Sequence, residues 1–510
     1  MNPFEKYRSH QANHSTETSS DTEGTPANDS ATINNIAVTK PAGKPAIKKP
    51  QAEESAEMQY AKHIKACSDI RVGGDLMYRW DGNFWKVQDD KEATRLAFVW
   101  LGDNMGKRAT VATAESCLKA AMLFAEPLPE KSDELVIPLV GMWLVVDQQG
   151  KIRAEAPNPA IGVTHYVPIV ASMKMGDYQP RPLPADSMFA RFLATSLPNS
   201  EVRSLVQAYV GYSLTGHTNH QVAQFWIGEK GGNGKSTMLK IVMALHEKAV
   251  PVQLDKLDGF NLTSLIGATL VACDETPKGK IDQQMLKSLI SGGATQINRK
   301  YKNAVGYANT AKFIICANHL PGLIDQSDAF WRRFHVIEWN ETFTNGKAIP
   351  DLDGKIIKNE LHYVLDWALS GLQALQRAGK FVVPDAVHDA AYQAKLDSNS
   401  VASWAEYAGV AYCDESQLSM NKGVLFQDYT GYCRANGLTA CASPQFYTRV
   451  RSLFPHVIES RQTMGSGINK KRVRCVNLTM GVFGADGLKT QVAEEMDEII
   501  QAFGYDKESE

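Results

Sequence analysis

The sequence predicts an α/β protein built around a parallel sheet. Three observations lead to this prediction: an apolar segment followed by a glycine-rich turn, a second apolar segment that ends in two acids, and a third that ends in asparagine. Short apolar runs of this kind are typical of strands buried on both faces, as in parallel sheets. Polar residues that follow such strands meet at the carboxyl edge of the sheet, where open α/β sheets bind ligands. The pattern therefore predicts one ligand site at that edge.

The first segment has the strand, loop and helix context of a P-loop. An apolar run over 222–227 precedes the glycines, and a helical pattern follows them. Glycines let successive backbone N–H groups point at a phosphate chain, and the helix start adds the positive end of its dipole. We therefore expect seven residues to bind ATP: Gly231, Gly232, Asn233, Gly234, Lys235, Ser236 and Thr237.

One irregularity separates this loop from the usual pattern. Five residues rather than four lie between Gly228 and Gly234, so Glu229 stands where the first glycine is expected. Within the loop, Lys235 is expected to reach the β- and γ-phosphates, and the Ser236 hydroxyl to bind Mg²⁺. A glycine turn without a nucleotide is the alternative.

The second segment is a buried strand that ends in Asp274 and Glu275. An apolar strand has little reason to end in paired acids unless they face a ligand. We expect Asp274 to hold Mg²⁺ through water, and Glu275 to orient and deprotonate the attacking water. A solvated turn is the alternative for this pair when it is considered alone.

Three further features follow in the chain. A predicted hairpin over 296–307 has a basic tip with Lys300 and Lys302, the next strand ends in Asn318, and the pair Arg332 and Arg333 precedes a last strand. Each has a plainer explanation on its own. A strand-end asparagine can be a turn residue, an arginine pair a solvated face, and a basic tip protection against edge pairing.

In this order and spacing, the motifs resemble those of superfamily 3 helicases, and more narrowly the helicase part of phage, plasmid and poxvirus-type primase-helicases. The resemblance covers about 189–339 and implies an AAA+-like ATPase core. It implies that Asn318 positions the lytic water and that Arg332 or Arg333 is an arginine finger inserted into the neighbouring subunit. It also implies that the hairpin around Lys300 and Lys302 lines a ring pore and contacts DNA phosphates.

Composition and charge set outer limits. The chain of 510 residues has 44% hydrophobic residues and a formal net charge of −2, so any DNA affinity must come from local patches. Its eight cysteines form no Cys-x-x-Cys pair, which argues against zinc and against a disulfide framework. The polar first 24 residues do not resemble a signal peptide, and the longest apolar run, 135–146, is too short to span a bilayer. We expect a soluble, cytoplasmic protein with no membrane partner.

Changes in composition predict five parts. The predicted helices around the ATPase strands are 188–214, 355–378 and 386–408, and an N-terminal hairpin over 76–86 has Asp-Gly at its turn. The parts are a disordered tether (1–58), a small mixed domain similar to that of the same family (60–170), the ATPase domain with flanking helices (185–395), a C-terminal domain (400–478) and an acidic tail (479–510).

The C-terminal part has a helix, helix and two-stranded wing pattern, typical of a winged-helix domain. Its second helix is expected to start with Ser443 as N-cap. Basic residues outnumber acids between 444 and 475, a local bias that the net charge of the whole chain hides. We expect DNA phosphates to contact Arg449, Arg451, Lys470 and Lys471; a purely structural wing is the alternative.

Together these features predict an ATP-dependent DNA helicase that acts as a hexameric ring in the replication of a phage, plasmid or other mobile element. The first 170 residues leave no room for a full primase, so any primase is expected on another chain. One alternative is a replication initiator or DNA-remodelling ATPase without processive unwinding. A DNA-binding module without hydrolysis is disfavoured by Lys235, Asp274 and Glu275, and a small-molecule kinase by the later asparagine and arginines.

Overall fold

The computed structural model describes most of the chain between Glu54 and Gly481. Outside the described residues lie Glu275, Lys300, Lys470, nearly all of the predicted tether and the acidic tail beyond residue 481; of Lys302 and Lys471 only the backbone is described. The described residues are 54–170, 172–257, 259–274, 281–299, 302–318, 328–343, 349–413, 420–436, 438, 440–464 and 471–481.

The first described part combines a helical cluster with a small antiparallel sheet of order β1-β2-β3. The predicted hairpin is present, with its Asp-Gly turn between β2 and β3, and Trp85 is fully buried, so this side chain serves the core. Helix α1 takes up residues 56–58, which the sequence assigned to the tether, because Ser55 caps its first turn. The elements are α1 (Ala56–Ala66), β1 (Ile70–Gly73), β2 (Leu76–Trp80), β3 (Trp85–Val87), α2 (Asp90–Met105), a 3₁₀ turn (Gly106–Arg108) and α3 (Val111–Phe124).

A four-stranded antiparallel sheet follows, in the order β4-β5-β6-β7. Its strands are β4 (Leu135–Leu139), β5 (Met142–Val146), β6 (Ile152–Glu155) and β7 (Gly176–Tyr178). The buried side chains of one face, such as Ile137 and Leu144, belong to the same apolar cluster as the helices that follow, whereas Val136 and Trp143 on the other face join a smaller cluster with Phe84. The predicted boundary after residue 170 therefore falls inside a continuous core.

The central sheet has five parallel strands in the order β14-β8-β13-β10-β9. If the five strands of this sheet are numbered 1 to 5 in chain order, their order across the sheet is 5-1-4-3-2. The mixed α/β class with a parallel sheet is therefore as predicted. The strands are β8 (Ala223–Ile227), β9 (Ala249–Pro251), β10 (Leu270–Cys273), β13 (Lys312–Ala317) and β14 (Phe334–Glu338).

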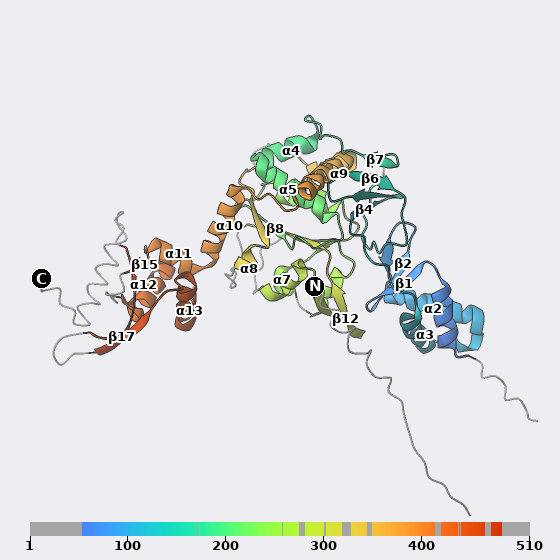
Figure 1. Cartoon of the computed structure of the whole chain (residues 1–510), viewed down its shortest axis with the longest axis horizontal. Coiled ribbons are helices and arrows are strands. Elements are labelled where there is room, and N and C mark those ends of the chain that lie inside the picture. Colours follow the sequence, from blue (N-terminus) through green and yellow to red (C-terminus); the bar gives the residue numbers. More distant parts are fainter. Residues whose placement is uncertain are drawn as a thin grey trace, which may run out of the picture. The chain divides into compact units, whose positions relative to one another are not determined.

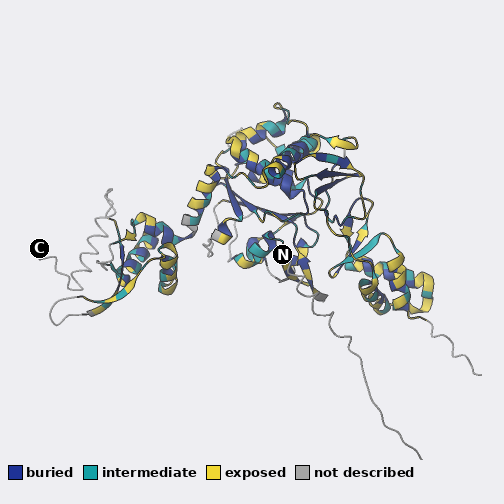
Figure 2. Ribbon diagram, in the orientation of Figure 1, coloured by how far each residue is buried: buried dark blue, intermediate teal, exposed yellow. Residues whose placement is uncertain are grey.

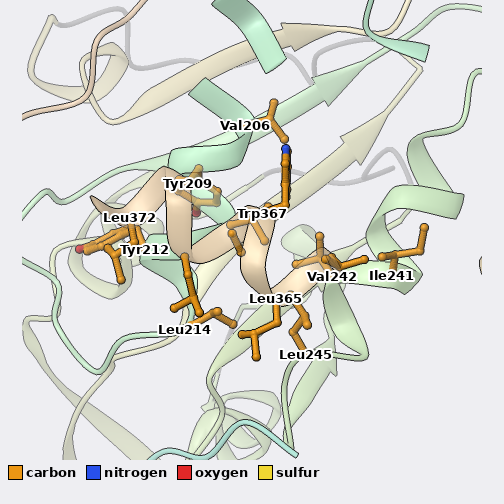
Figure 3. Close-up of a cluster of buried hydrophobic side chains, with 14 of the residues drawn as sticks. Val206, Tyr209, Tyr212, Leu214, Ile241, Val242, Leu245, Leu365, Trp367 and Leu372 are labelled. Carbon is orange, nitrogen blue, oxygen red and sulfur yellow. The ribbon is translucent and has the colours of Figure 1, made fainter. Parts of the chain in front are cut away.

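Helices and loops cover both faces of this sheet (Figures 1 and 2). Successive residues along a strand enter different cores. Trp226 and Ile314 join a core formed with α5, α6 and α9, whereas Phe225 and Phe313 join a second core formed with α7, α10 and the N-terminal hairpin. Figure 3 shows side chains from α5, α6 and α9 meeting in the first core. The helices are α4 (Met188–Ser196), α5 (Ser200–Ser213), α6 (Lys235–Met243), α7 (Gln283–Ile290), α8 (Asp328–Trp331), α9 (Leu352–Ala378) and α10 (Asp385–Ser398).

Two predicted helices are wrong in extent. The helix predicted over 188–214 is interrupted before Asn199, which caps α5, because Pro198 has no N–H to donate. The helix predicted over 386–408 breaks at Asn399, whose side chain caps the next helix. Between α7 and β13, the predicted hairpin is present as β11 (Ala294–Arg299) and β12 (Lys302–Ala308); short 3₁₀ turns span Leu254–Lys256 and Gly259–Leu265.

The C-terminal part packs three helices around its own apolar cluster. Three strands form a sheet of order β16-β18-β17. The predicted cap is wrong: Ala442 is the N-cap of α13 and Ser443 is its first residue. The elements are α11 (Ser400–Tyr407), β15 (Ala411–Tyr412), β16 (Met420–Asn421), α12 (Lys422–Ala435), α13 (Ser443–Leu453), β17 (Glu459–Met464), β18 (Lys471–Val476) and β19 (Leu478–Thr479).

Within the described part of the chain, none of the helices combines the length and the apolar character that crossing a membrane requires.

Candidate functional site

The glycine-rich loop connects β8 to α6, and its backbone has conformations that favour glycine. Gly232 and Gly234 have φ values of 75° and 94°. A Cβ atom on Gly234 would lie 2.9 Å from the Ser196 hydroxyl and 3.0 Å from the ring of Phe192. The loop therefore passes so close to α4 that residue 234 must lack a side chain. The first N–H groups of α6, which no helical carbonyl can pair, follow directly.

Lys235 is held at the end of β8 by acceptors that the sequence did not reveal. Its side chain is buried, and its ammonium donates hydrogen bonds to the Gly228 carbonyl at 2.9 Å and to Asn233 Oδ1 at 3.0 Å. The Asn233 amide in turn donates to the Trp339 carbonyl at 2.9 Å. Burial lowers the pKa of Lys235 from its usual value. The loop and the end of β14 thus position this lysine together.

Ser236 and Asp274 meet although they belong to different strand ends. Ser236 Oγ donates a hydrogen bond of 2.9 Å to Asp274 Oδ1. Ser236 lies in the first turn of α6, and Asp274 directly follows β10. A hydroxyl and a carboxylate are both oxygen ligands of the kind that Mg²⁺ prefers. Glu275, the expected base, lies outside the described residues.

The two strands nearest this site have connections that leave in opposite directions. The chain goes from β8 through α6 to β9 at one edge, and from β13 through α8 to β14 at the other. Such a divergence opens a crevice at the carboxyl ends of the two strands. There Ala317 pairs with Ile227, and Asn318 follows. A cavity of about 480 Å³ occupies the crevice, lined by residues 231–237, Asp274, Cys316, Ala317 and Asn318.

Two cysteines lie at the strand ends beside this cavity. Burial raises the pKa of Cys273 to about 12 and that of Cys316 well above its usual range. Both side chains therefore remain protonated thiols at neutral pH. Neither supplies a thiolate beside Lys235.

The predicted arginine pair lies at a different cavity. Arg332 is exposed, whereas Arg333 is half-buried and donates to Ser291 Oγ at 3.2 Å and to the Ala329 carbonyl. Burial, together with the charge of Arg332, lowers the pKa of Arg333. This second cavity, of about 600 Å³, shares no lining residue with the first: it is lined by Gln283, Gln284, Lys287, Ser288, Ser291, Ala329, Arg332 and Arg333.

The predicted hairpin is anchored at its base. Arg299, at the end of β11, forms an ion pair of 2.9 Å with Asp90 at the start of α2. The buried side chains Ile297 and Val305 face the same core as the N-terminal hairpin. The side chains of Lys300 and Lys302 at the tip lie outside the described set.

The residues of the C-terminal part that were predicted to contact DNA differ in burial and in ion pairing. Arg449 is half-buried on α13. Arg451 donates to Glu459 Oε1 at 2.6 Å, and Lys422 donates to the same oxygen at 2.7 Å. Two cations therefore already neutralise Glu459, and a negatively charged ligand must compete with it for Arg451. Lys470 and the side chain of Lys471 lie outside the described set.

Comparisons with known proteins give one family model and one distant relative. Residues 226–333 match the model of a family described as of unknown function (DUF5906). Over 252 residues the chain is 24% identical to "Putative helicase 121R" of Invertebrate iridescent virus 3, a match that covers 40% of this chain and 26% of the relative. The chain therefore spans about a quarter of the length of that curated relative. The sequence is thus similar, at low identity, to part of a protein named as a helicase.

Two solved structures show more distant likenesses. The apo C-terminal region of NrS-1 is 14% identical, with 81% of this chain and 97% of that chain covered and a TM-score of 0.44. A JCV helicase is 13% identical, with 40% and 58% covered and a TM-score of 0.26. At these values neither likeness carries an argument about this chain.

Proposed function

We propose that this chain is an ATP-dependent DNA helicase that acts as a hexameric ring in the replication of a phage, plasmid or other mobile element. One observation carries the proposal: Lys235, the Ser236–Asp274 pair and Asn318 meet in one cavity at the carboxyl edge of a parallel sheet. The helicase activity in this proposal is supported by the name of the relative that is 24% identical.

The cavity fits a nucleoside triphosphate chemically. Its volume of about 480 Å³ lies within the range of ligand sites, roughly 300 to 1,000 Å³. The N–H groups at the start of α6 and the ammonium of Lys235 suit phosphate oxygens. Ser236 and Asp274 are suited to hold Mg²⁺, which would neutralise charge on the β- and γ-phosphates.

In this proposal the chain's own residues divide the work of hydrolysis. Glu275, next to Asp274 in the sequence, accepts the proton of the attacking water. Asn318 lies in the wall of the cavity, where its amide orients that water. Lys235 binds the phosphates and has to exchange its carbonyl partners for phosphate oxygens to do so.

The separate cavity of Arg332 and Arg333 supports an oligomeric enzyme. Its lining shares no residue with the cavity of Lys235, and in this proposal the arginine that stabilises the transition state comes from a neighbouring subunit. A ring provides this arrangement at every interface. In the same proposal, the β11–β12 hairpin with Lys300 and Lys302 contacts DNA, as does the C-terminal domain, and a primase is a separate chain.

The test is ATP hydrolysis and unwinding of forked DNA by a Lys235→Ala variant, with Lys230→Ala as its matched control. Lys230 lies in the same loop but is exposed and does not line the cavity. We expect Lys235→Ala to abolish turnover and Lys230→Ala to keep it. Equal activity of the two variants would contradict the proposed site. Hydrolysis and ring formation without unwinding would favour the initiator or remodelling alternative.

A further inference from the structure

The C-terminal sheet has a face on which charge is unusually one-sided. In the β17–β18 pairing, Arg461 lies directly opposite Arg474, and Thr463 opposite Arg472. Side chains alternate along a strand, so these four residues share one face of the hairpin. All four are exposed. We call Arg461, Arg472 and Arg474 the arginine face.

The arginine face continues from the domain core. The next pair on the same face, towards the core, is Glu459 opposite Val476. Val476 is buried in the apolar cluster of this domain, and Glu459 binds Lys422 and Arg451 from the two helices. The arginine face therefore lies on the side of the sheet that α12 and α13 cover at its base, and it extends beyond them.

No ion pair neutralises the arginine face within the described part of the chain. The acid nearest along the strands, Glu459, already accepts from Lys422 and Arg451 through one oxygen. Like charges directly opposite each other on paired strands are destabilising. An external anion bound between the two would therefore stabilise this cross-strand arginine pair.

We propose that the arginine face binds the phosphate backbone of duplex DNA, in place of the predicted contact by Arg451. The planar guanidinium group pairs with phosphate in a bidentate way that lysine does not match. A two-stranded β-ribbon also fits the major groove of B-DNA, which is about 12 Å wide. The inference rests on the proposed function, because that function identifies the polyanion as DNA. It also names the residues through which the C-terminal domain contacts the DNA.

The experiment compares duplex binding across a salt series, without nucleotide, for the full chain and for Arg461→Gln/Arg472→Gln/Arg474→Gln. Each lost phosphate contact should flatten the slope of log K against log salt by about 0.9, so we expect a total change of about two to three units. Arg474→Gln is matched with Arg434→Gln, an exposed arginine on α12. We expect the first variant to change the slope by about one unit and the second to leave it unchanged.

Several results would overturn the proposal. These are an unchanged slope in the triple variant, an equal effect of Arg434→Gln, or a lower Tm of the triple variant, which would indicate a structural role. Loss of binding to phosphatidylserine vesicles with intact DNA binding would assign the face to lipid headgroups instead. Because binding is measured without ATP, it can also be repeated with Lys235→Ala, so a failure of the helicase proposal and a failure of this one are distinguishable.

Discussion

The hydroxyl of Ser236 donates a hydrogen bond of 2.9 Å to the carboxylate of Asp274, which lies 38 residues further along the chain. This bond joins the start of the helix after one strand to the end of another. It brings two oxygen ligands together in the lining of the cavity that Lys235 also lines. The pair is thus the most direct link between the glycine loop and the acidic strand end.

Removing the hydroxyl should weaken magnesium-dependent nucleotide binding. We expect Ser236→Ala to lower the affinity for Mg²⁺–ATP about tenfold, as typical of losing one hydrogen bond to a charged group, and to change binding in excess EDTA little. Ser236→Thr keeps the hydroxyl and should retain most of the affinity. Titration of a fluorescent ATP analogue measures both. An equal loss in EDTA would show that Ser236 does not act through the metal.

Replacing Glu275 should slow ATP hydrolysis without weakening ATP binding. We expect Glu275→Gln to bind ATP normally but to hydrolyse it about a hundredfold more slowly, within the range of general-base losses. Steady-state phosphate release and equilibrium ATP binding, measured on the same preparation, check the two parts. Normal turnover would remove Glu275 as the base.

The arginine pair should act across a subunit interface. Mixing Lys235→Ala subunits with Arg332→Ala or Arg333→Ala subunits should restore part of the ATPase activity. At some interfaces an intact site then meets an intact arginine. Activity is measured against the mixing ratio. A mixture no more active than the sum of its separate components would place the whole site within one subunit.

Gly234 should tolerate no side chain, unlike its neighbour Gly231. A Cβ on Gly234 would meet Ser196 Oγ at 2.9 Å in a backbone conformation with φ of 94°, whereas one on Gly231 would meet nothing within 4 Å. We expect Gly234→Ala to lower Tm and to weaken ATP binding about tenfold or more, and Gly231→Ala to leave Tm unchanged. Thermal unfolding with and without ATP tests the contrast; similar Tm values for both variants would contradict the loop geometry.

The stability of the protein should fall in mild acid. Burial lowers the pKa of both His165 and His246 to about 3, so below pH 6.5 the unfolded chain binds protons that the folded chain does not. Each histidine should then reduce the free energy of unfolding by about 1.4 kcal/mol per pH unit, down to its folded pKa. Urea unfolding between pH 7.5 and 5 measures this slope.

We expect the free energy of unfolding of His246→Gln to depend less steeply on pH than that of the parent protein. Replacement of the exposed His63 by Gln should leave this slope unchanged. A slope that is the same in all three proteins would mean that His246 titrates alike in the folded and unfolded chain.

The parts of the fold that follow from local pattern were predictable. Strands β8, β10 and β13 are short, mostly apolar runs, followed by the glycine loop, by Asp274 and by Asn318. The meeting of Lys235, Asp274 and Asn318 in one cavity follows from their parallel pairing. The helix limits were less predictable, because the periodicity of buried residues continues across Pro198 and Asn399, where the backbone turns.

Several partners of the site side chains could not be predicted, because they are backbone carbonyls. The Gly228 and Trp339 carbonyls hold Lys235 and Asn233, and no residue type marks a carbonyl as an acceptor. In the same way, the sequence shows that Arg451 is basic but not that Glu459 lies across from it. A count of charges cannot separate paired cations from unpaired ones.

The core that β4–β7 share with α4, α5 and α9 constrains the evolution of this protein. A fragment that began at residue 185 would leave apolar side chains of three helices in water, and such a surface favours aggregation. Exchange of the N-terminal segment for a foreign one would meet the same obstacle, since the new segment must match that surface in shape. The antiparallel sheet and the helices beneath it are therefore expected to be inherited as one block.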